Sequence, residues 1–145
     1  MGFRFPVTDV MEDRWFDRVL DGKDKSQAYF AIESVEDQAL VGFCSLVDID
    51  YQSSNAQLGI MIGDSSKHKG GLGTDALRLT LSFAFKSLNL NRVYVFVRAQ
   101  NAAANKLFDK LGFEQEGVLK DHYFVDGEYE DVHVKALLKS QFKDT

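Results

Sequence analysis

The feature that most constrains the fold is a glycine-rich stretch, residues 67–76, which reads Lys-His-Lys-Gly-Gly-Leu-Gly-Thr-Asp-Ala. The apolar residues that follow recur near the helical period, which predicts a helix over residues 71–88. Glycine allows a ligand to approach the backbone closely, and the first N–H groups of a helix lack partners and favour negative charge. The stretch therefore predicts either an anion site, most often for phosphate, or a glycine-rich turn without a ligand.

Length and composition narrow the choice of function. A chain of 145 residues predicts a single domain, residues 1–145. The net charge of −5 argues against nucleic acid or an anionic membrane as the main partner. The single cysteine, Cys44, cannot form an internal disulfide, which favours a cytoplasmic protein. No stretch is apolar enough to span a membrane, no metal-ligand spacing occurs, and the glycine loop lacks the Gly-Lys-Ser/Thr ending of a nucleotide P-loop.

The order of the predicted elements indicates an α+β, or mixed α/β, domain. Strands are expected over residues 28–35, 40–51, 56–63, 92–98, 113–125 and 128–138, and helices over residues 9–20, 71–88 and 101–111. Asn101 is a candidate N-cap, Gly112 a C-terminal cap, and Gly117 a candidate bulge. Asp126-Gly127 is a strong two-residue hairpin signal.

Several separate motifs in this order resemble the GNAT-type N-acetyltransferase family. The family's phosphate loop falls on His68-Lys69-Gly70-Gly71-Leu72-Gly73, and its next signature on Asn101 to Phe108 followed by Leu111-Gly112-Phe113. The strand 56–60 and the tail 117–131 resemble the branch that includes ribosomal-protein and polyamine acetyltransferases. The resemblance covers about residues 27–138.

The resemblance implies a twisted, mostly antiparallel sheet with a central splay, flanked by helices, and acetyl-CoA as co-substrate without a metal. The residues implied in cofactor binding are Met61, Ile62, His68, Lys69, Gly70, Gly71, Leu72, Gly73, Thr74, Asn101 and Phe108. Backbone N–H groups of residues 71–74 would hold the pyrophosphate. The pantetheine arm would lie between strands 56–63 and 92–98, against the backbone of Met61 and Ile62.

Two positions depart from the family pattern in the catalytic machinery. Phe108 stands where many members have a tyrosine that protonates the leaving thiolate, and Gln57 stands where relatives of this branch often have glutamate. Neither side chain can exchange a proton. The remaining candidates include Asp48 and Asp50, and the catalytic assignment is given to His122, Tyr123 and Asp121, because histidine is the side chain whose ordinary pKa lies near neutrality. A lone histidine in a strand is also commonly structural.

A third departure lies at the start of the chain. The family normally begins with a strand and a helix that precede the helix expected at residues 9–20, and we expect both to be missing here. The strand over residues 28–35 would then be an unprotected edge. We expect a homodimer to cover it, and the alternative is that residues 3–7 fold back as a substitute strand.

The function implied by the resemblance is transfer of acetyl from acetyl-CoA to a primary amine of a protein N-terminus, a polyamine or another small amine. Five acidic residues near the last hairpin would attract a cationic amine or would form a solvated tip: Asp121, Asp126, Glu128, Glu130 and Asp131. The alternative function is a catalytically weak or inactive acyl-CoA-binding module, which the residues at positions 57 and 108 favour.

Overall fold

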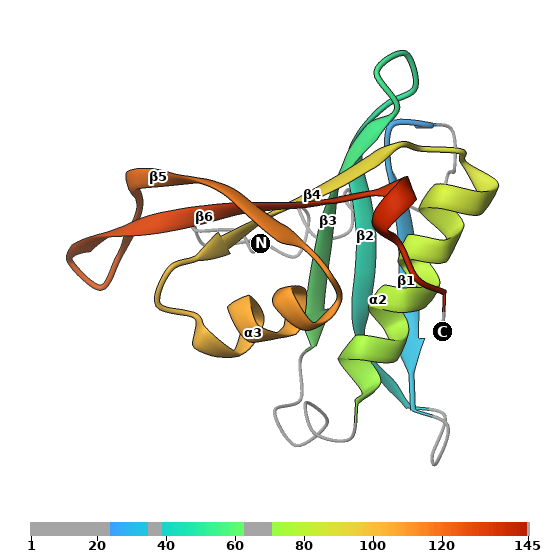
Figure 1. Ribbon diagram of the computed structural model, residues 1–145. Coiled ribbons are helices and arrows are strands. Elements are labelled where there is room, and N and C mark those ends of the chain that lie inside the picture. Colours follow the sequence, from blue (N-terminus) through green and yellow to red (C-terminus); the bar gives the residue numbers. More distant parts are fainter. Residues whose placement is uncertain (1–23, 35–38, 63–70, 145) are drawn as a thin grey trace.

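The computed structural model describes residues 24–34, 39–62 and 71–144 (Figure 1). The elements in chain order are β1 (Ala28–Glu33), β2 (Leu40–Asp50), β3 (Asn55–Ile62), α2 (Leu72–Ser82) with a π-helical end (Phe83–Ser87), β4 (Arg92–Arg98), α3 (Ala102–Lys110), β5 (Glu114–Val125), β6 (Glu128–Leu138) and a short 3-10 turn (Lys139–Gln141). The α+β class and the elements predicted in this part are confirmed, with ends that shift by one or two residues. The predicted segments 3–7 and 9–20 lie outside the described residues.

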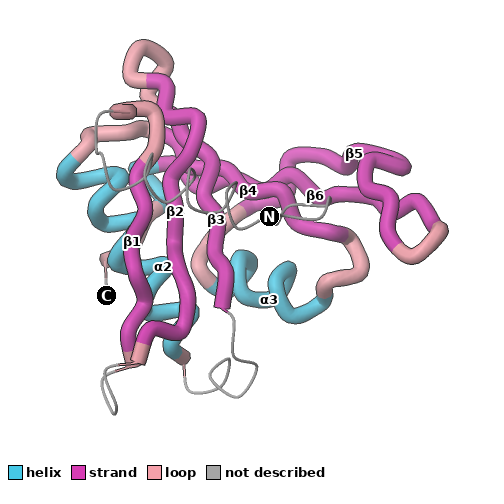
Figure 2. The backbone as a smooth tube through the Cα atoms, turned by 180° about the vertical axis from the view of Figure 1, so that it is seen from behind, coloured by secondary structure: helices cyan, strands magenta, loops and turns pink. Residues whose placement is uncertain are grey.

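The six described strands form one sheet in the order β1-β2-β3-β4-β6-β5. Every neighbouring pair is antiparallel except β3 and β4, which run parallel because α2 carries the chain between them. Both helices lie on one side of the sheet, which we call the helix face, and Figure 2 shows the sheet from the opposite side, the reverse face.

The core fills the space between the helix face and the two helices. Alternate residues of β4, Val93, Val95 and Val97, are buried there, in one cluster with residues of α2 and α3. The helical period of α2 places Leu77 and Leu81 against them with no exposed surface. The intervening residues of β4 therefore face the reverse side.

The parallel contact between β3 and β4 is short. Their register runs through three pairs and ends at Gln57 opposite Tyr94, although β3 continues to Ile62 and β4 to Arg98. Beyond that point β4 stays paired with β6 up to Arg98. The two parallel strands therefore splay apart toward their carboxyl ends, as the family resemblance implies.

The β5–β6 hairpin projects beyond the rest of the sheet (Figure 1). Its turn is Asp126-Gly127, both at positive φ (50° and 79°), as predicted for a two-residue hairpin. The register shifts between Gln115 and Gly117, which confirms the predicted bulge, and shifts again between Leu119 and Tyr123. A second bulge follows from this shift, and it distorts the segment that carries the catalytic candidates.

Candidate active site

The first part of the site is the amino end of α2. Its N-cap, Gly71, adopts φ 78° and ψ 8°, the left-handed conformation that glycine allows without strain. The first N–H bonded within the helix is that of Asp75, which donates to the carbonyl of Gly71 at 2.9 Å. The preceding N–H groups, on residues 72–74, therefore point out of the helix end, as an anion site requires.

Three further residues predicted for this loop, His68, Lys69 and Gly70, lie outside the described residues. Leu72, Gly73 and Thr74 form the first turn of α2, as the sequence predicts. The roles of all six in binding remain predictions.

The second part of the site is the edge of β3 beyond Gln57. Residues 58–62 pair with β2 on one side, and on the other side no described strand pairs with them. An unpaired strand edge of this kind accepts an extended ligand that carries amide groups as if it were a further strand. Met61 and Ile62 lie on this edge, and the side chain of Met61 is half exposed.

The third part is the amino end of α3. The side-chain Oδ1 of Asn101 accepts a hydrogen bond from the N–H of Ala104 at 3.0 Å, so its N-cap role is confirmed. Its contact with a pantetheine arm remains a prediction. Phe108 is only 5% exposed and packs edge-on against Phe113, with ring centroids 5.2 Å apart. The phenylalanine that replaces the family's tyrosine is therefore a core residue here.

The three predicted catalytic residues lie on the distorted part of β5. The backbone N–H of Asp121 donates to Asp131 Oδ1 at 2.9 Å, and Asp121 has a positive φ of 49°. His122 is exposed. Tyr123 reaches back to the end of β4, where the guanidinium of Arg98 lies 5.2 Å from its ring centroid. The structure thus brings only Tyr123 to the splayed strands.

The reverse face of β4 carries four side chains that the sequence pattern had not singled out: Arg92, Tyr94, Phe96 and Arg98. Both arginines are paired. Arg92 binds Glu116 through two hydrogen bonds of 2.7 and 2.5 Å. The signal in the sequence was the alternation of valine with these residues along the strand, which predicts two faces of different chemistry.

Tyr94 and Phe96 form an aromatic pair between these two arginines. Their ring centroids are 5.7 Å apart at an interplanar angle of 71°, and Arg92 lies 5.8 Å from the ring of Tyr94. Burial raises the pKa of the Tyr94 phenol, and the negative charge of Asp48 raises it further against a smaller opposite effect of Arg92. The phenol is therefore protonated over the physiological pH range.

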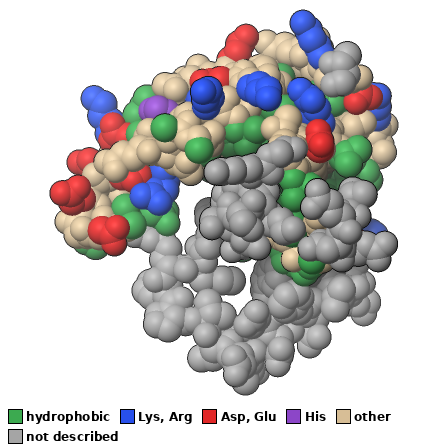
Figure 3. All heavy atoms as spheres, turned by 90° about the horizontal axis from the view of Figure 1, so that it is seen from below, with side chains coloured by type: hydrophobic (Ala, Val, Ile, Leu, Met, Phe, Trp, Pro, Cys, Tyr) green, Lys and Arg blue, Asp and Glu red, His purple; other side chains and the backbone are tan. Residues whose placement is uncertain are grey.

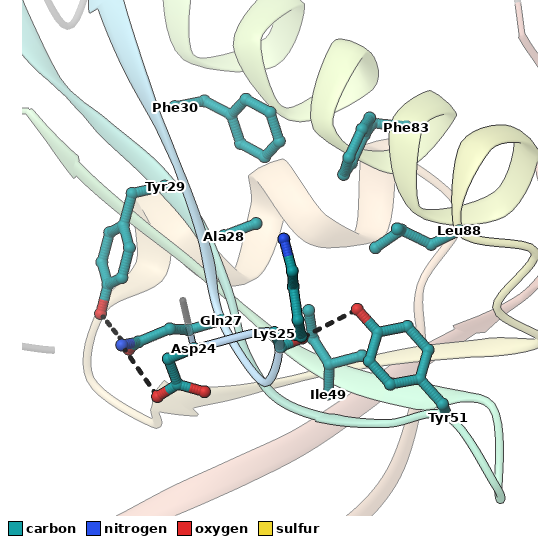
Figure 4. A pocket seen from close by; sticks show the side chains of 10 residues that line it. All are labelled: Asp24, Lys25, Gln27, Ala28, Tyr29, Phe30, Ile49, Tyr51, Phe83 and Leu88. Atoms are coloured by element: carbon teal, nitrogen blue, oxygen red, sulfur yellow. Dashed lines mark hydrogen bonds between the residues drawn. The ribbon is translucent and has the colours of Figure 1, made fainter. Parts of the chain in front are cut away.

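A separate cavity of about 330 Å³ lies beside Phe83 and Leu88 (Figure 4). These two residues belong to the carboxyl end of the helix that begins after Gly71. The cavity is lined by Asp24, Lys25, Gln27, Ala28, Tyr29, Phe30, Ile49, Tyr51, Phe83 and Leu88. The Tyr51 hydroxyl donates to the carbonyl of Lys25 at 2.8 Å, and Phe30 packs edge-on against Phe83. This cavity is remote from the amino end of α2, so it is not the predicted cofactor site.

Other chemistry is sparse in the described part of the chain. Cys44 is buried, and burial raises the pKa of its thiol, against a smaller lowering by a hydrogen bond with Thr80. Within residues 24–34, 39–62 and 71–144, no group of three or more His, Cys, Asp or Glu side chains is placed to hold a metal. None of the described helices is long and apolar enough to cross a membrane.

Comparison with known proteins shows the family to which the chain belongs. Residues 1–114 match the family model of the acetyltransferase (GNAT) domain. A spermidine N(1)-acetyltransferase of Vibrio cholerae is 30% identical over 119 residues, which are 82% of this chain and 68% of that protein. An uncharacterized N-acetyltransferase of Bacillus licheniformis is 32% identical over 139 residues, 94% of this chain and 78% of that protein.

The same relationship appears among solved structures. The spermidine N-acetyltransferase of Vibrio cholerae in complex with CoA and spermine superposes with a TM-score of 0.85 at 26% identity, over 94% of this chain and 78% of that one. The chain belongs to the GNAT acetyltransferase family, whose members transfer an acetyl group from acetyl-CoA to an amine. The resemblance inferred from the motifs is thereby confirmed.

Proposed function

We propose that this protein acetylates the primary amine of a polyamine, of another small amine or of a protein N-terminus. The observation that carries the proposal is the early end of the β3–β4 ladder at Gln57 and Tyr94, beyond which both strands continue. Such a splay leaves an unpaired strand edge beside the start of the phosphate-loop helix. An extended acyl-CoA needs both features, one for its amide-bearing arm and one for its pyrophosphate.

Different groups of the chain would bind different parts of acetyl-CoA. The N–H groups of residues 72–74 would hold the pyrophosphate, helped by the positive end of the α2 dipole. The backbone of Met61 and Ile62 would pair with the amides of the pantetheine arm. The thioester would then lie toward the base of the splay, near Gln57 and Tyr94.

Two observations support a cationic amine as acceptor. The chain carries a net charge of −5, and Asp and Glu side chains gather at the end of the β5–β6 hairpin (Figure 3), where Asp126 and Glu128 are exposed. Negative potential raises the local concentration of a cationic substrate. Because two of the relatives are named for spermidine, polyamines are the first amines to test.

Acetyl transfer forms a C–N bond and breaks the C–S bond of the thioester. The neutral amine nitrogen attacks the thioester carbonyl carbon, the C–S bond breaks with its electron pair passing to sulfur, and one proton moves overall from nitrogen to sulfur. The products are the N-acetylamine and free CoA.

A non-catalytic acyl-CoA-binding module is the second candidate function. It is favoured by Phe108 and Gln57, since neither can carry the proton that the family's tyrosine and glutamate exchange. Both functions require the same cofactor site, and they differ only in turnover.

The test is acetyl-CoA binding by calorimetry together with CoA release in the presence of spermidine, spermine, a short peptide and an amino acid. Gly73→Val should lose most of its acetyl-CoA affinity, because a branched side chain would intrude where the backbone meets the pyrophosphate. Gly117→Val is the matched control, since its added Cβ meets no atom of the described part of the chain within 4 Å.

Three outcomes are informative. Binding with amine-dependent CoA release supports the acetyltransferase. Binding without release from any of the four amines supports the binding module. Unchanged affinity in a folded Gly73→Val variant contradicts the loop assignment.

A further inference from the structure

We propose that Tyr94 is a catalytic residue of this chain, the group that passes a proton to the departing sulfur at the base of the splayed strands. This inference rests on the proposed acetyl transfer and adds the proton donor that Phe108 cannot supply.

The position of Tyr94 follows from the register of the sheet. It is the last residue of β4 that pairs with β3, opposite Gln57. A ligand that enters the splay along the free edge of β3 reaches its end where this pair closes the gap between the strands. The reacting end of an extended acyl-CoA would therefore stop beside Tyr94 and Gln57.

The side chain of Tyr94 lies on the reverse face of the sheet, because its neighbours Val93 and Val95 are buried on the helix face. The negative charge of Asp48 on β2 is one of the causes that raise the pKa of the Tyr94 phenol. Because β3 lies between β2 and β4, two strand spacings of about 5 Å each separate the backbones of Asp48 and Tyr94. Gln57 pairs with Val47 of β2 on one edge and with Tyr94 on the other, so Asp48, the residue after Val47, and Tyr94 stand on opposite sides of Gln57. Tyr94 therefore stands at the base of the splay, with its side chain on the reverse face.

A bulge in β2 places Asp48 on the same face. The register shifts between Val47 and Asp50, and Asp48 adopts a positive φ of 51°. Leu46 and Ile49 both remain buried in the core, which turns Asp48 to the reverse face. Bulges re-aim side chains in this way and are frequent beside active sites.

The hydroxyl of Tyr94 is available for this task. No hydrogen bond with a described residue is among the causes that set its pKa, whereas the two arginines that flank it on β4 are each engaged by a glutamate. The charged groups that face Tyr94 are Asp48 from β2 and Arg92 from its own strand, with Glu116 of β5 bound to that arginine. The side chain that faces it from β3 is the neutral Gln57.

The chemistry requires a protonated donor near the sulfur. As the C–S bond breaks, sulfur takes the electron pair and the Tyr94 O–H transfers its proton to sulfur; the resulting phenolate takes the proton that nitrogen loses. Tyr94 ends the cycle unchanged, and the atoms balance without a further reactant. Burial and Asp48 keep the phenol protonated before the step, as an acid must be.

The first test compares Tyr94→Phe with wild type in steady-state acetyl transfer. The variant keeps the ring against Phe96 and removes only the hydroxyl. We expect kcat to fall by about 10²-fold, the low end for acid catalysis, with KM for acetyl-CoA unchanged. Tyr129→Phe, an exposed tyrosine of the hairpin, is the matched control and should keep its kcat.

The second test needs no turnover. In protein labelled with ¹³C at the tyrosine Cζ, the Tyr94 signal is assigned by its absence from Tyr94→Phe, and CoA is added. We expect the Tyr94 signal to shift and the Tyr129 signal to stay. In Asp48→Asn the Tyr94 signal should titrate at lower pH, because the variant removes the negative charge that raises the phenol's pKa.

The results separate the two proposals. A wild type that binds CoA but acetylates none of the four amines would contradict the proposed function, while the NMR signal would still report whether Tyr94 meets the cofactor. A Tyr94 signal that stays in place when CoA is bound would overturn the role of Tyr94. So would a Tyr94→Phe variant with the kcat of Tyr129→Phe in an active enzyme.

Discussion

Lys135 on β6 is 2% exposed, and its ammonium donates to Oδ1 of Asp109 on α3 at 2.6 Å. The side chain of Asp109 is 61% exposed, so the charge buried by folding is that of the lysine. A second bond, from the Lys135 ammonium to the carbonyl of Asn105 at 3.3 Å, holds the same helix. The pair fastens α3, and with it Asn101 and Phe108, to the sheet.

Substitution of Asp109 and substitution of Lys135 should therefore lower the free energy of unfolding by unequal amounts. Asp109→Asn leaves a buried ammonium without its counter-charge and should lower the free energy of unfolding by about 1–3 kcal/mol, less than for a fully buried pair because solvent reaches Asp109. Lys135→Met removes the buried charge and keeps the volume, and we expect a smaller loss. Urea denaturation of both variants measures the difference, and a larger loss in Lys135→Met would contradict it.

Glu130 should make the stability depend on pH. It is buried, and its bidentate hydrogen bonds with Arg98 lower the pKa of its carboxyl below the ordinary 4.5. A lowered folded pKa gives stability that is present above the ordinary pKa and is lost as pH falls through the folded one.

The measurement for Glu130 is Tm against pH. Wild type should lose Tm as the pH falls from about 5 to 3. Glu130→Gln should start from a lower Tm at pH 7 and fall less over this range. Parallel curves for the two proteins would show that Glu130 does not contribute to the loss of Tm at low pH.

Gly71 tests the conformation of the α2 N-cap. An added Cβ would meet no atom of the described residues within 4 Å, so the cost of Gly71→Ala is conformational, about 1–2 kcal/mol for a left-handed residue. Gly71→Asn should cost less, because asparagine tolerates this region. Thermal unfolding ranks the two, and equal Tm values would mean that the N-cap relaxes to a different conformation.

Phe108→Tyr should affect stability more than turnover. The ring is buried against Phe113, so an added hydroxyl without a partner would cost about 1–3 kcal/mol. If Tyr94 supplies the proton, a second phenol leaves kcat unchanged. A tenfold rise in kcat, about 1.4 kcal/mol of barrier, would show instead that the family's acid position is functional here.

The edge of the sheet predicts a homodimer. β1 is the last of the described strands on its side, and such an edge is normally covered or paired. We expect sedimentation at micromolar concentration to give a dimer. Ala31→Lys, an exposed position on β1, should dissociate it, whereas Leu79→Lys on the exposed side of α2 should not. A monomeric wild type whose β1 amides exchange slowly would contradict the prediction.

Local signals predicted most of the fold. The helical period after the glycine loop, the Asn101 cap and the Asp126-Gly127 turn each depend on neighbouring residues, and each is confirmed. Strand order could not be predicted from local signals, because the placement of β6 between β4 and β5 depends on pairings between distant segments. Only the family resemblance implied the splay.

For the same reason, one part of the candidate site could be predicted from the sequence and another part could not. The amino end of α2 is a local motif, and the structure forms it as expected. The placement of Tyr94 and Asp48 on either side of Gln57 depends on a bulge in β2 and on the order of three strands, and neither can be inferred from spacing. Tyr123 reaches the splayed strands because a second bulge distorts β5.

The short ladder between β3 and β4 also bears on how the chain folds. On each side of that ladder, each strand pairs with strands that are close to it in the sequence. Strands β1, β2 and β3 form one meander, and β4, β5 and β6 form another group, which includes α3. Local pairings close small loops and form early. The two groups are joined by three residue pairs and by the side chains that α2 and α3 bury between them. We expect each group to gain hydrogen-exchange protection separately during refolding, with the Gln57–Tyr94 pair, and hence the base of the active site, protected last.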